Sequence, residues 1–274
     1  MFTAIHPFPG IMHITDIMGV SFTLIEGSES AILFDTGYGI EDVYSYIRTL
    51  TDKPFKVVLS HGHHDHMLGA RWFHETFMSE DDKEEFIERT GTLQRLKVKK
   101  QAEEKHVDVP ETFMNAEIPL PVKIRFDEKA GMFEGRTERL GNLDIRLIHV
   151  PGHTPGSVVL FIPDYELLLT GDNWNPCTWM WFPSSVSAFV WRENMKSVIR
   201  WLEKEYNCSA GNVLCSHQPM IRQGSEMKSF LEFMTDERMK SAPSINMGVP
   251  INTHIIRNEA HDWTLLFDKD KLKQ

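Results

Sequence analysis

Two stretches of the chain repeat the same order of elements, and this repeat limits the fold more than any other feature of the sequence. Residues 32–61 read ILFDTG, then a helical pattern, then VVLSH; residues 167–217 read LLLTGD, then a helical pattern, then VLCSH. In each stretch an Asp lies near the end of one apolar run, and Ser-His follows the next run. Open α/β sheets bind ligands beyond the carboxyl ends of their strands. The repeat therefore predicts that these Asp and His side chains lie around a ligand site.

The remaining patterns place further strands and helices around this repeat. Apolar runs separated by turn residues predict a hairpin with strands at 19–26 and 30–34, and strand patterns return after residue 122. Helical spacing of apolar residues predicts helices at 40–51 and 188–206. Residues 77–106 are highly charged and predict solvated helices broken near Gly91, either as an exposed insertion or as a lid over a cleft.

The part of the chain after His217 has weaker patterns. It carries a helical stretch near Met227–Met239 and two short apolar runs, Thr253–Ile256 and Trp263–Phe267, and it has no linker that would make it a separate domain. We expect one domain over residues 1–274, with a charged helical insertion at about 77–110 and a C-terminal extension at about 220–274.

The composition is that of a folded protein with an acidic balance. Of 274 residues 41% are hydrophobic, and 29 basic residues against 39 acidic ones give a net charge of −10. A field of this sign repels phosphate backbones and anionic membrane surfaces, so neither nucleic acid nor a membrane is an expected partner. No apolar run approaches the ~18 residues of a membrane span, and no basic start precedes an apolar core at the N-terminus, so we expect a cytoplasmic protein. Three cysteines outside any Cys-x-x-Cys motif indicate neither a disulfide framework nor a zinc ribbon.

The segment Ser60–His66, SHGHHDH, follows an apolar strand directly and carries metal-binding side chains at close spacing. In an extended segment residues i and i+2 point the same way, so His61 and His63 can reach one ion together. A turn that begins at His64 would direct the side chains of Asp65 and His66 toward a second metal position. Imidazole and carboxylate ligands suit a borderline divalent ion such as zinc. Because structural zinc sites usually have all four ligands from the protein and are rich in Cys, this pattern of His and Asp favours a catalytic site.

Two ions need more ligands than this segment supplies, and three further candidates lie at the ends of other predicted elements. His153 lies in PGHTPGS, where two Pro and two Gly predict a tight turn that presents the imidazole. Asp172 follows an apolar strand, and its two carboxylate oxygens could bridge two cations ~3.5–4 Å apart. His217 follows the last strand of the repeat. Asp35, at the end of the first repeat's strand, is either an acceptor that orients a ligand histidine or a turn residue.

These motifs resemble those of the metallo-β-lactamase superfamily, especially its glyoxalase II-like and lactonase-like hydrolases. The resemblance rests on SHGHHDH, PGHTPGS, TGD and the last SH, in this order, and covers about residues 17–219. It implies an α+β fold, a four-layer αββα sandwich with the metal site at one edge of the two sheets. It also implies one metal held by His61, His63 and His153, a second held by Asp65, His66 and His217, and Asp172 bridging both.

The same resemblance implies a dinuclear metal-dependent hydrolase acting on a small molecule. A metal-bridging hydroxide, formed near neutral pH, would cleave a small ester, thioester, lactone or related acyl substrate. Asp65 and Asp172 are the implied catalytic residues, and Asp65 could also assist proton transfer. Zinc is the expected ion, with iron or manganese as alternatives. Two other reactions stay open: cleavage of a phosphodiester or nucleic acid, and mononuclear-iron dioxygenation of a thiol or persulfide.

Differences from the motifs of known branches of the superfamily narrow the range of expected substrates but do not identify one. The zinc β-lactamases usually have Cys at the position of Asp172, which argues against antibiotic hydrolysis. Homoserine-lactone hydrolases have Tyr where this chain has Asn175, and glyoxalase II has Gly-His-Glu-Tyr where this chain reads Ser216-His217-Gln218-Pro219. The diiron flavoprotein branch replaces the second histidine with Glu, whereas His63 is present here.

A Trp-rich segment follows Asp172 directly. Residues 173–183 read NWNPCTWMWFP, and Trp174, Trp179 and Trp181 are candidate substrate contacts, because an aromatic wall suits an apolar or aromatic acyl group. The competing interpretation is a homodimer contact, since exposed Trp and Met are enriched at protein interfaces. Trp191 and Trp201 have helical spacing and are expected in the core.

Overall fold

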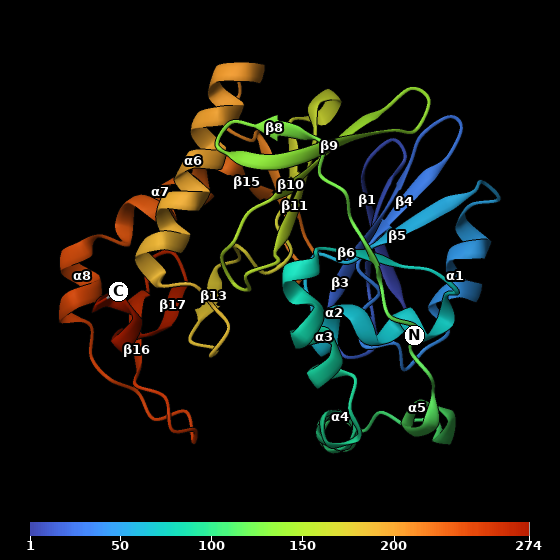
Figure 1. The fold of residues 1–274 in the computed structure, drawn as a ribbon, viewed down its shortest axis with the longest axis horizontal. Coiled ribbons are helices and arrows are strands. Elements are labelled where there is room, and N and C mark those ends of the chain that lie inside the picture. The colour runs from blue at the N-terminus through green and yellow to red at the C-terminus, as the bar shows by residue number, and fades with distance from the viewer. Residues whose placement is uncertain (274) are drawn as a thin grey trace. The chain divides into compact units, whose positions relative to one another are not determined.

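The computed structural model describes residues 1–273, which divide into two compact units. The first consists of Met1–Arg125, Thr137–Ile145 and Ser216–Met220, and the second of Phe126–Arg136, Arg146–Cys215 and the residues from Ile221 onward. Each unit has a mixed β-sheet and an apolar core of its own (Figure 1). His217 therefore belongs to the same unit as the SHGHHDH segment, although some 150 residues separate them in sequence.

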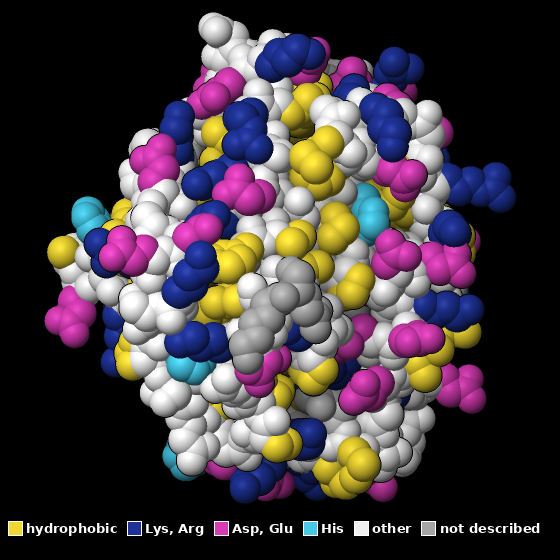
Figure 2. All heavy atoms as spheres, turned by 60° about the vertical axis from the view of Figure 1, so that its left-hand side comes forward, with side chains coloured by type: hydrophobic (Ala, Val, Ile, Leu, Met, Phe, Trp, Pro, Cys, Tyr) yellow, Lys and Arg dark blue, Asp and Glu magenta, His cyan; other side chains and the backbone are white. Residues whose placement is uncertain are grey.

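The surface carries charges of both signs. On the face that Figure 2 shows, Lys and Arg side chains lie among Asp and Glu side chains, with small apolar areas between them. Within residues 1–273, none of the helices combines the length and the apolar character that a membrane span requires.

The sheet of the first unit changes from antiparallel to parallel pairing. Its strands in spatial order are β1 Thr3–Phe8, β2 Ile11–Thr15, β3 Ser21–Glu26, β4 Ala31–Phe34, β5 Phe55–Val58, β6 Phe77–Met78 and β7 Val122–Lys123. Pairing is antiparallel from β1 to β4 and parallel from β4 to β7. The predicted hairpin is confirmed as β3 and β4, with Leu24 opposite Leu33. The carboxyl ends of β4 and β5 lie side by side, which brings Asp35 to the start of the SHGHHDH segment.

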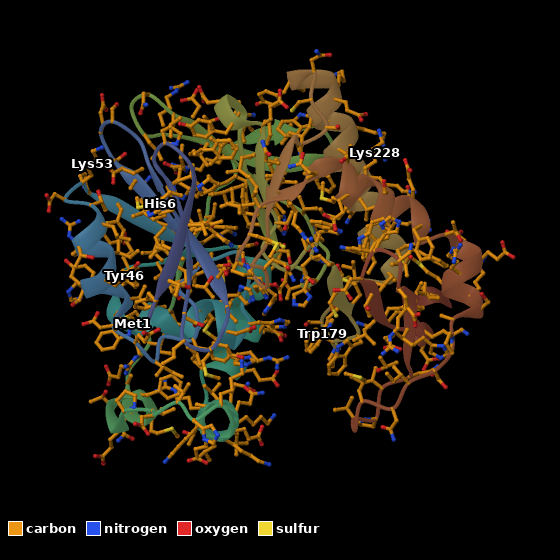
Figure 3. All side chains as sticks on the ribbon, turned by 180° about the vertical axis from the view of Figure 1, so that it is seen from behind. Met1, His6, Tyr46, Lys53, Trp179 and Lys228 are labelled. Carbon is orange, nitrogen blue, oxygen red and sulfur yellow. The ribbon has the colours of Figure 1, made fainter. Side chains whose placement is uncertain are left out.

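Local sequence signals explain where the helices of this unit begin. Helix α1 Val43–Leu50 starts at Asp42, whose carboxylate accepts a hydrogen bond from the Ser45 backbone N–H at 2.9 Å. Val43 and Ile47, one turn apart, join the core of the sheet, while Tyr46, which is labelled in Figure 3, stacks on Phe2. The other helices are α2 His64–Met67, η1 Leu68–Trp72, η2 Glu80–Asp82, α3 Lys83–Arg89, α4 Thr92–Glu104 and α5 Glu111–Asn115. The predicted break near Gly91 is confirmed, since α4 begins immediately after that residue.

The second unit contains a larger and a smaller sheet. The larger sheet has the spatial order β15 Arg222–Gln223, β14 Asn212–Leu214, β12 Leu167–Leu169, β11 Val158–Ile162, β10 Asp144–His149, β9 Phe133–Arg139 and β8 Glu128–Ala130. The end of β9 and the start of β10 fall within residues 137–145, which belong to the first unit. The smaller sheet has the order β13 Cys177–Met180, β17 Trp263–Asp268 and β16 Thr253–Asn258. Strand β13 pairs parallel with β17, so the C-terminal part of the chain supports the Trp-rich segment.

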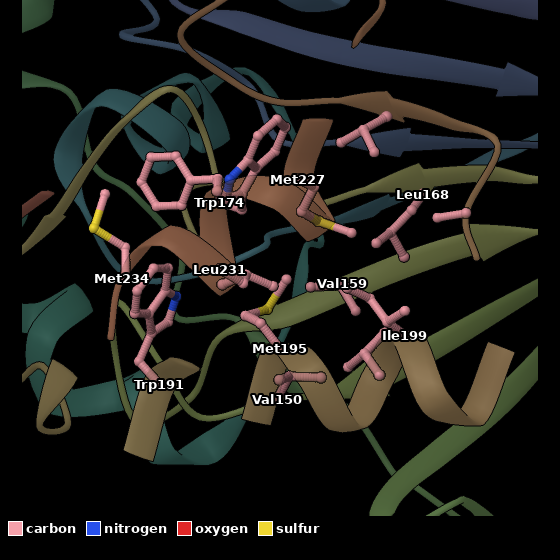
Figure 4. Packing of buried hydrophobic residues seen from close by; sticks show 14 of the residues in the cluster. Val150, Val159, Leu168, Trp174, Trp191, Met195, Ile199, Met227, Leu231 and Met234 are labelled. Carbon is pink, nitrogen blue, oxygen red and sulfur yellow. The ribbon is translucent and has the colours of Figure 1, made fainter. Parts of the chain in front are cut away.

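Helix α6 Ala188–Tyr206 has the predicted bounds and supplies much of the second core. Ser187 caps its first turn by accepting from the Val190 N–H, and Trp191, Met195 and Leu202 recur on its buried face. Figure 4 shows this face packed against α7 and neighbouring strands. The predicted buried position of Trp191 and Trp201 is confirmed.

The predicted helix near 227–239 is wrong in one respect, because two helices occupy the region. They are α7 Gly224–Phe233 and α8 Asp236–Ser241, and Thr235 between them caps α8 by accepting from the Arg238 N–H. The remaining elements are the short helices η3 Pro163–Tyr165 and η4 Lys269–Lys273.

Candidate metal centre

The SHGHHDH segment forms an irregular loop followed by one helical turn. The loop follows β5, and α2 begins at His64 after an extended His63, which confirms the predicted turn. Three imidazoles gather there, because the ring of His61 lies 4.7 Å from that of His63 and 4.1 Å from that of His66. All three side chains are buried. The loop thus presents a cluster of imidazoles in an interior position where water competes little.

Asp65, His66 and His217 form one group of potential ligands within the first unit. Asp65 Oδ2 lies 3.6 Å from Nε2 of His66 and 3.6 Å from Nε2 of His217. These separations exceed hydrogen-bonding distance. They are close to the roughly 3.4 Å expected between two ligand atoms that each lie about 2.0–2.1 Å from one tetrahedral ion. The donor types and their spacing therefore fit a divalent cation.

His217 is positioned by its two neighbours in sequence. The Ser21 N–H at the start of β3 donates to the Ser216 carbonyl at 2.6 Å. The buried His13 on β2 bonds through Nε2 to the Gln218 carbonyl at 2.9 Å and through Nδ1 to Thr23 Oγ1 at 2.9 Å. Sequence reasoning missed His13, and no local signal marks it, because its partner lies more than two hundred residues away.

Hydrogen bonds on the far side of the rings determine which nitrogen each histidine offers. Asp35 Oδ2 lies 3.1 Å from His66 Nδ1, and Asp35 also accepts from the backbone N–H and the hydroxyl of Ser60, at 2.6 and 2.7 Å. The Ser60 hydroxyl oxygen in turn lies 2.9 Å from His61 Nδ1. Because each Nδ1 is engaged in this way, His61 and His66 offer Nε2 to a ligand. Asp35 thus contacts a histidine that the sequence predicts as a ligand, which is the position expected of an orienting acceptor.

The charged insertion also contacts this loop, which the sequence did not predict. Glu85 on α3 lies with Oε1 3.1 Å from His63 Nε2, and the same oxygen accepts from Arg89 Nε at 2.9 Å. Burial raises the pKa of Glu85, but the hydrogen bond and charge of His63, together with Arg89, outweigh it and lower the pKa to about 2. The buried Asp82 accepts from the Gly62 N–H at 2.8 Å. The view of residues 77–106 as a merely exposed insertion is therefore wrong for these side chains.

The second unit contributes His153 and Asp172, with the same donor spacing. His153 Nε2 lies 3.6 Å from Asp172 Oδ2, while His153 Nδ1 bonds to the Trp179 carbonyl at 2.6 Å. The His153 backbone N–H donates to Asn173 Oδ1 at 2.8 Å. A Cβ on Gly152 would lie 2.2 Å from that same oxygen, so the tight turn requires glycine there. His153 therefore also offers Nε2.

The three candidate Trp residues occupy different environments. Trp174 has no exposed surface and packs edge-on against Phe230 in the core, so it offers no surface to a substrate and its predicted role as a contact is not retained (Figure 4). Trp179, which is labelled in Figure 3, lies on β13 and is 39% exposed, and Trp181 is half-buried. Phe182, which sequence reasoning missed, stacks on Trp181 and lies edge-on to His153 at 5.2 Å. Trp179, Trp181 and Phe182 thus form an aromatic cluster beside a predicted ligand.

Comparison with known structures shows the fold. The inverting sec-alkylsulfatase Pisa1 from Pseudomonas sp. is similar over 87% of this chain, with 15% identity and a TM-score of 0.60; this chain covers only 43% of that protein. A metallo-β-lactamase from Erythrobacter litoralis is similar over 84% of this chain and 95% of its own, with 16% identity and a TM-score of 0.57. One from Pontibacter korlensis is similar over 86% of this chain and 100% of its own, with 18% identity and a TM-score of 0.53.

Identities this low show likeness of fold, and no curated protein matches the chain in sequence. The predicted fold class is confirmed: it is the mixed α and β fold of the metallo-β-lactamase sandwich. The sequence profile described as the metallo-beta-lactamase superfamily matches residues 15–197, about two thirds of the chain. This match begins in the second strand and includes every predicted ligand except His217. The chain belongs to the metallo-β-lactamase superfamily.

Proposed function

We propose that this protein is a hydrolase that uses two divalent cations, with zinc as the expected ion, to cleave a small ester, thioester, lactone or related acyl compound. The observation that carries the proposal is the position of Asp65, whose Oδ2 lies 3.6 Å from the Nε2 atoms of both His66 and His217. Asp35 holds His66 from the other side, so this donor set is arranged in advance.

The proposal requires the predicted ligands of both units to serve the same pair of cations. In the superfamily pattern His61, His63 and His153 hold one ion, Asp65, His66 and His217 hold the other, and Asp172 is shared. The 3.6 Å spacing of His153 Nε2 and Asp172 Oδ2 supports the second unit's part in this set. When bound, two such cations supply positive charge that lowers the pKa of water toward about 7 and polarises a substrate oxygen.

The protein's own contribution is to hold the donor atoms ready and to keep them in the correct protonation state. Ser60 and Asp35 keep the protons of His61 and His66 on Nδ1, and the Trp179 carbonyl does the same for His153. We propose Asp65 and Asp172 as the catalytic carboxylates, which bind the cations and accept the proton of the attacking water.

The aromatic cluster of Trp179, Trp181 and Phe182 is the proposed binding surface for the acyl part of the substrate. The ring of Phe182 lies edge-on to His153, and Trp179 exposes 39% of its surface, so an apolar group bound there would lie beside a ligand of the site. A homodimer contact through the same exposed aromatic surface is the competing role, and the oligomeric state in solution distinguishes the two.

A substrate panel tests the proposal. Metal-reconstituted protein is assayed with chromogenic carboxyl esters, thioesters, lactones and phosphodiesters, and also with a secondary alkyl sulfate, because one of the similar structures is a sec-alkylsulfatase. We expect cleavage of an acyl compound with two zinc ions per chain. Preferred cleavage of the phosphodiester would favour the nuclease alternative, and one iron per chain with oxygen consumption would favour the dioxygenase alternative.

Two variants separate the dinuclear mechanism from a folding effect. We expect His63→Ala and Asp172→Ala each to abolish hydrolysis while the protein stays folded by circular dichroism. His74→Ala and Asp52→Ala serve as matched controls, since both side chains are exposed and lie outside the predicted ligand set. Full activity in either ligand variant would remove the dinuclear mechanism.

A further inference from the structure

We propose that Lys271 is a positioning residue for the aromatic cluster. Its ammonium group acts as a covalently attached cation among three backbone carbonyls, and it holds the loop of residues 181–186 in the shape that binds the substrate. This inference rests on the proposed function, because it concerns the surface proposed to bind the acyl group. Lys271 lies in the C-terminal extension, outside the residues 15–197 that the superfamily profile matches, so the ligand motifs do not account for it.

Three backbone carbonyls of this loop bind a single atom. Lys271 Nζ donates to the carbonyl oxygens of residues 182, 183 and 185, at 2.8, 2.7 and 2.5 Å. Three acceptors require three N–H donors, which the ammonium form of lysine has. Within residues 1–273 the carbonyls of Pro183 and Ser185 accept no other hydrogen bond, and the Phe182 carbonyl also accepts from the Ser185 N–H at 3.1 Å. The loop thus directs its carbonyls toward one positive charge.

A cation at this point keeps the three carbonyls together. The oxygen ends of three peptide dipoles repel one another when they face one point, and a positive charge among them turns this repulsion into attraction. Backbone carbonyls bind a potassium ion in the same manner, since they replace the water that surrounds the free ion. Loss of the ammonium group would leave the carbonyl of the buried Ser185 without a donor. The shape of the loop therefore depends on the charge of Lys271 more than on its aliphatic stem.

The loop is also joined to the turn that presents His153. Ser185 Oγ donates to the His153 carbonyl at 2.7 Å, and the Val186 N–H donates to the Gly152 carbonyl at 3.1 Å. Phe182, near the start of the loop, lies edge-on to the His153 ring, with the ring centres 5.2 Å apart. An ordered loop therefore places the Phe182 ring beside this histidine, where the acyl group of a substrate is proposed to bind.

The backbone around Lys271 is held independently of the loop. The short helix η4 follows β17, and β17 pairs with β13, the strand that leads into the loop (Figure 1). The Lys269 N–H donates to the Asn252 carbonyl at 3.0 Å, and Asn252 Nδ2 donates to Asp270 Oδ1 at 3.1 Å. Leu272 packs against the core of the second unit. Removal of the Lys271 amine should therefore loosen the loop without displacing η4.

Amide hydrogen exchange of the full-length protein tests the role of the charge. Wild type, Lys271→Ala and Lys271→Met are compared by mass spectrometry of peptides that cover the loop, in tetramethylammonium chloride and in ammonium chloride at the same ionic strength. The Ser185 and Val186 N–H groups report on the loop, because both are hydrogen-bonded in it. In tetramethylammonium chloride we expect them to exchange about 10-fold faster in Lys271→Ala than in wild type. Ammonium ions fit the space that alanine leaves and should restore the wild-type rate.

Lys271→Met fills that space without a charge, so it should exchange about 10-fold faster in both salts. Lys269→Ala is the matched control and should behave as wild type, since the Lys269 side chain makes no hydrogen bond or ion pair within residues 1–273. Wild-type rates in both Lys271 variants would overturn the proposal. Faster exchange in Lys271→Ala that ammonium does not reverse would also overturn it, because the stem would then support the loop. Lys271→Met decides the question even if the alanine variant unfolds.

Kinetics with an acetyl and an octanoyl ester of the same chromogenic alcohol tests the role in substrate binding. We expect Lys271→Ala to raise the KM of the octanoyl ester about 10-fold, with kcat and zinc content unchanged and with recovery in ammonium chloride. The KM of the acetyl ester should change less, since the short acyl group buries less of the aromatic cluster. A loosened loop with an unchanged KM would overturn the positioning role and leave the proposed function intact. A wild type that cleaves no acyl compound would overturn the proposed function, whereas the exchange rates would still decide whether the Lys271 charge shapes the loop.

Discussion

Replacement of Asp35 by Asn is the sharpest test of how the second cation is held, because the change removes a charge and almost no volume. Asp35 is buried and accepts three hydrogen bonds, from the Ser60 N–H at 2.6 Å, the Ser60 hydroxyl at 2.7 Å and His66 Nδ1 at 3.1 Å. Its φ of 68° lies in the left-handed region that Asn also adopts readily, so the backbone is not strained by the substitution.

The expected magnitude follows from these three bonds. If the amide oxygen faces His66, the amide nitrogen meets the Ser60 N–H, donor against donor. If the amide nitrogen faces His66, the proton of His66 must move from Nδ1 to Nε2, the atom that faces Asp65. One charge-assisted hydrogen bond is lost in either case, at a cost of about 1.5–3 kcal/mol. We therefore expect Asp35→Asn to weaken the binding of the cation that His66 holds by about 10–100-fold.

The assay is a chelator competition with zinc, and Asp52→Asn is the control because it makes the same chemical change at an exposed position. We expect Asp35→Asn to lower the affinity for the cation of His66, which Asp35 contacts directly, more than the affinity for the cation of His61, which it reaches only through Ser60. Equal affinities in Asp35→Asn and Asp52→Asn would refute the reasoning, since the Asp35 bonds would then play no part in metal binding.

Three further predictions concern the second unit. Lys271 Nζ donates to the carbonyls of residues 182, 183 and 185 at 2.8, 2.7 and 2.5 Å, so Lys271→Met should lower the free energy of unfolding by about 1.5–3 kcal/mol in urea, whereas Lys269→Met should not. Gly152→Ala would place a Cβ 2.2 Å from Asn173 Oδ1; we expect a loss of about 1–3 kcal/mol and weaker zinc binding, and an unchanged melting temperature would contradict this packing. Cys177 is exposed and the other cysteines are buried, so a thiol reagent should modify one cysteine rapidly in native protein and all 3 in denaturant; rapid modification of a second thiol in native protein would be inconsistent with the fold.

Elements with strong local signals could be predicted from the sequence. The bounds of α6 follow from the Ser187 cap and the recurrence of Trp191, Met195 and Leu202 on one face, all within a single segment. The hairpin of β3 and β4 follows from two apolar runs joined by turn residues. Here the information lies within one or two turns of chain, where periodicity reports it directly.

Strands whose pairing decides their structure could not be predicted in this way. Strand β2 buries His13 beside apolar neighbours, which obscures any alternation, and β1 is largely exposed. Strand β13 lies inside the Trp-rich segment and is held by β17, more than eighty residues later in the chain. Such non-local pairing leaves no periodic signal in the short strand itself.

The residues of the candidate site also divide into those that local sequence patterns predict and those that only tertiary contacts place. The ligand motifs identified the donor groups because their chemistry is local and dense in the sequence. Glu85, His13 and Phe182 were missed because each acts through a tertiary contact with a segment that local reasoning does not connect to it. Asp35 was predicted only because it ends a strand of the repeat, where the neighbouring parallel strand places Ser60 against it.

Anomalous diffraction at the zinc edge, from crystals of zinc-reconstituted protein, tests the central claim most directly. We predict two peaks per chain, one beside His61, His63 and His153, the other beside Asp65, His66 and His217, with Asp172 next to both. A single peak, or peaks remote from these side chains, would contradict the dinuclear assignment.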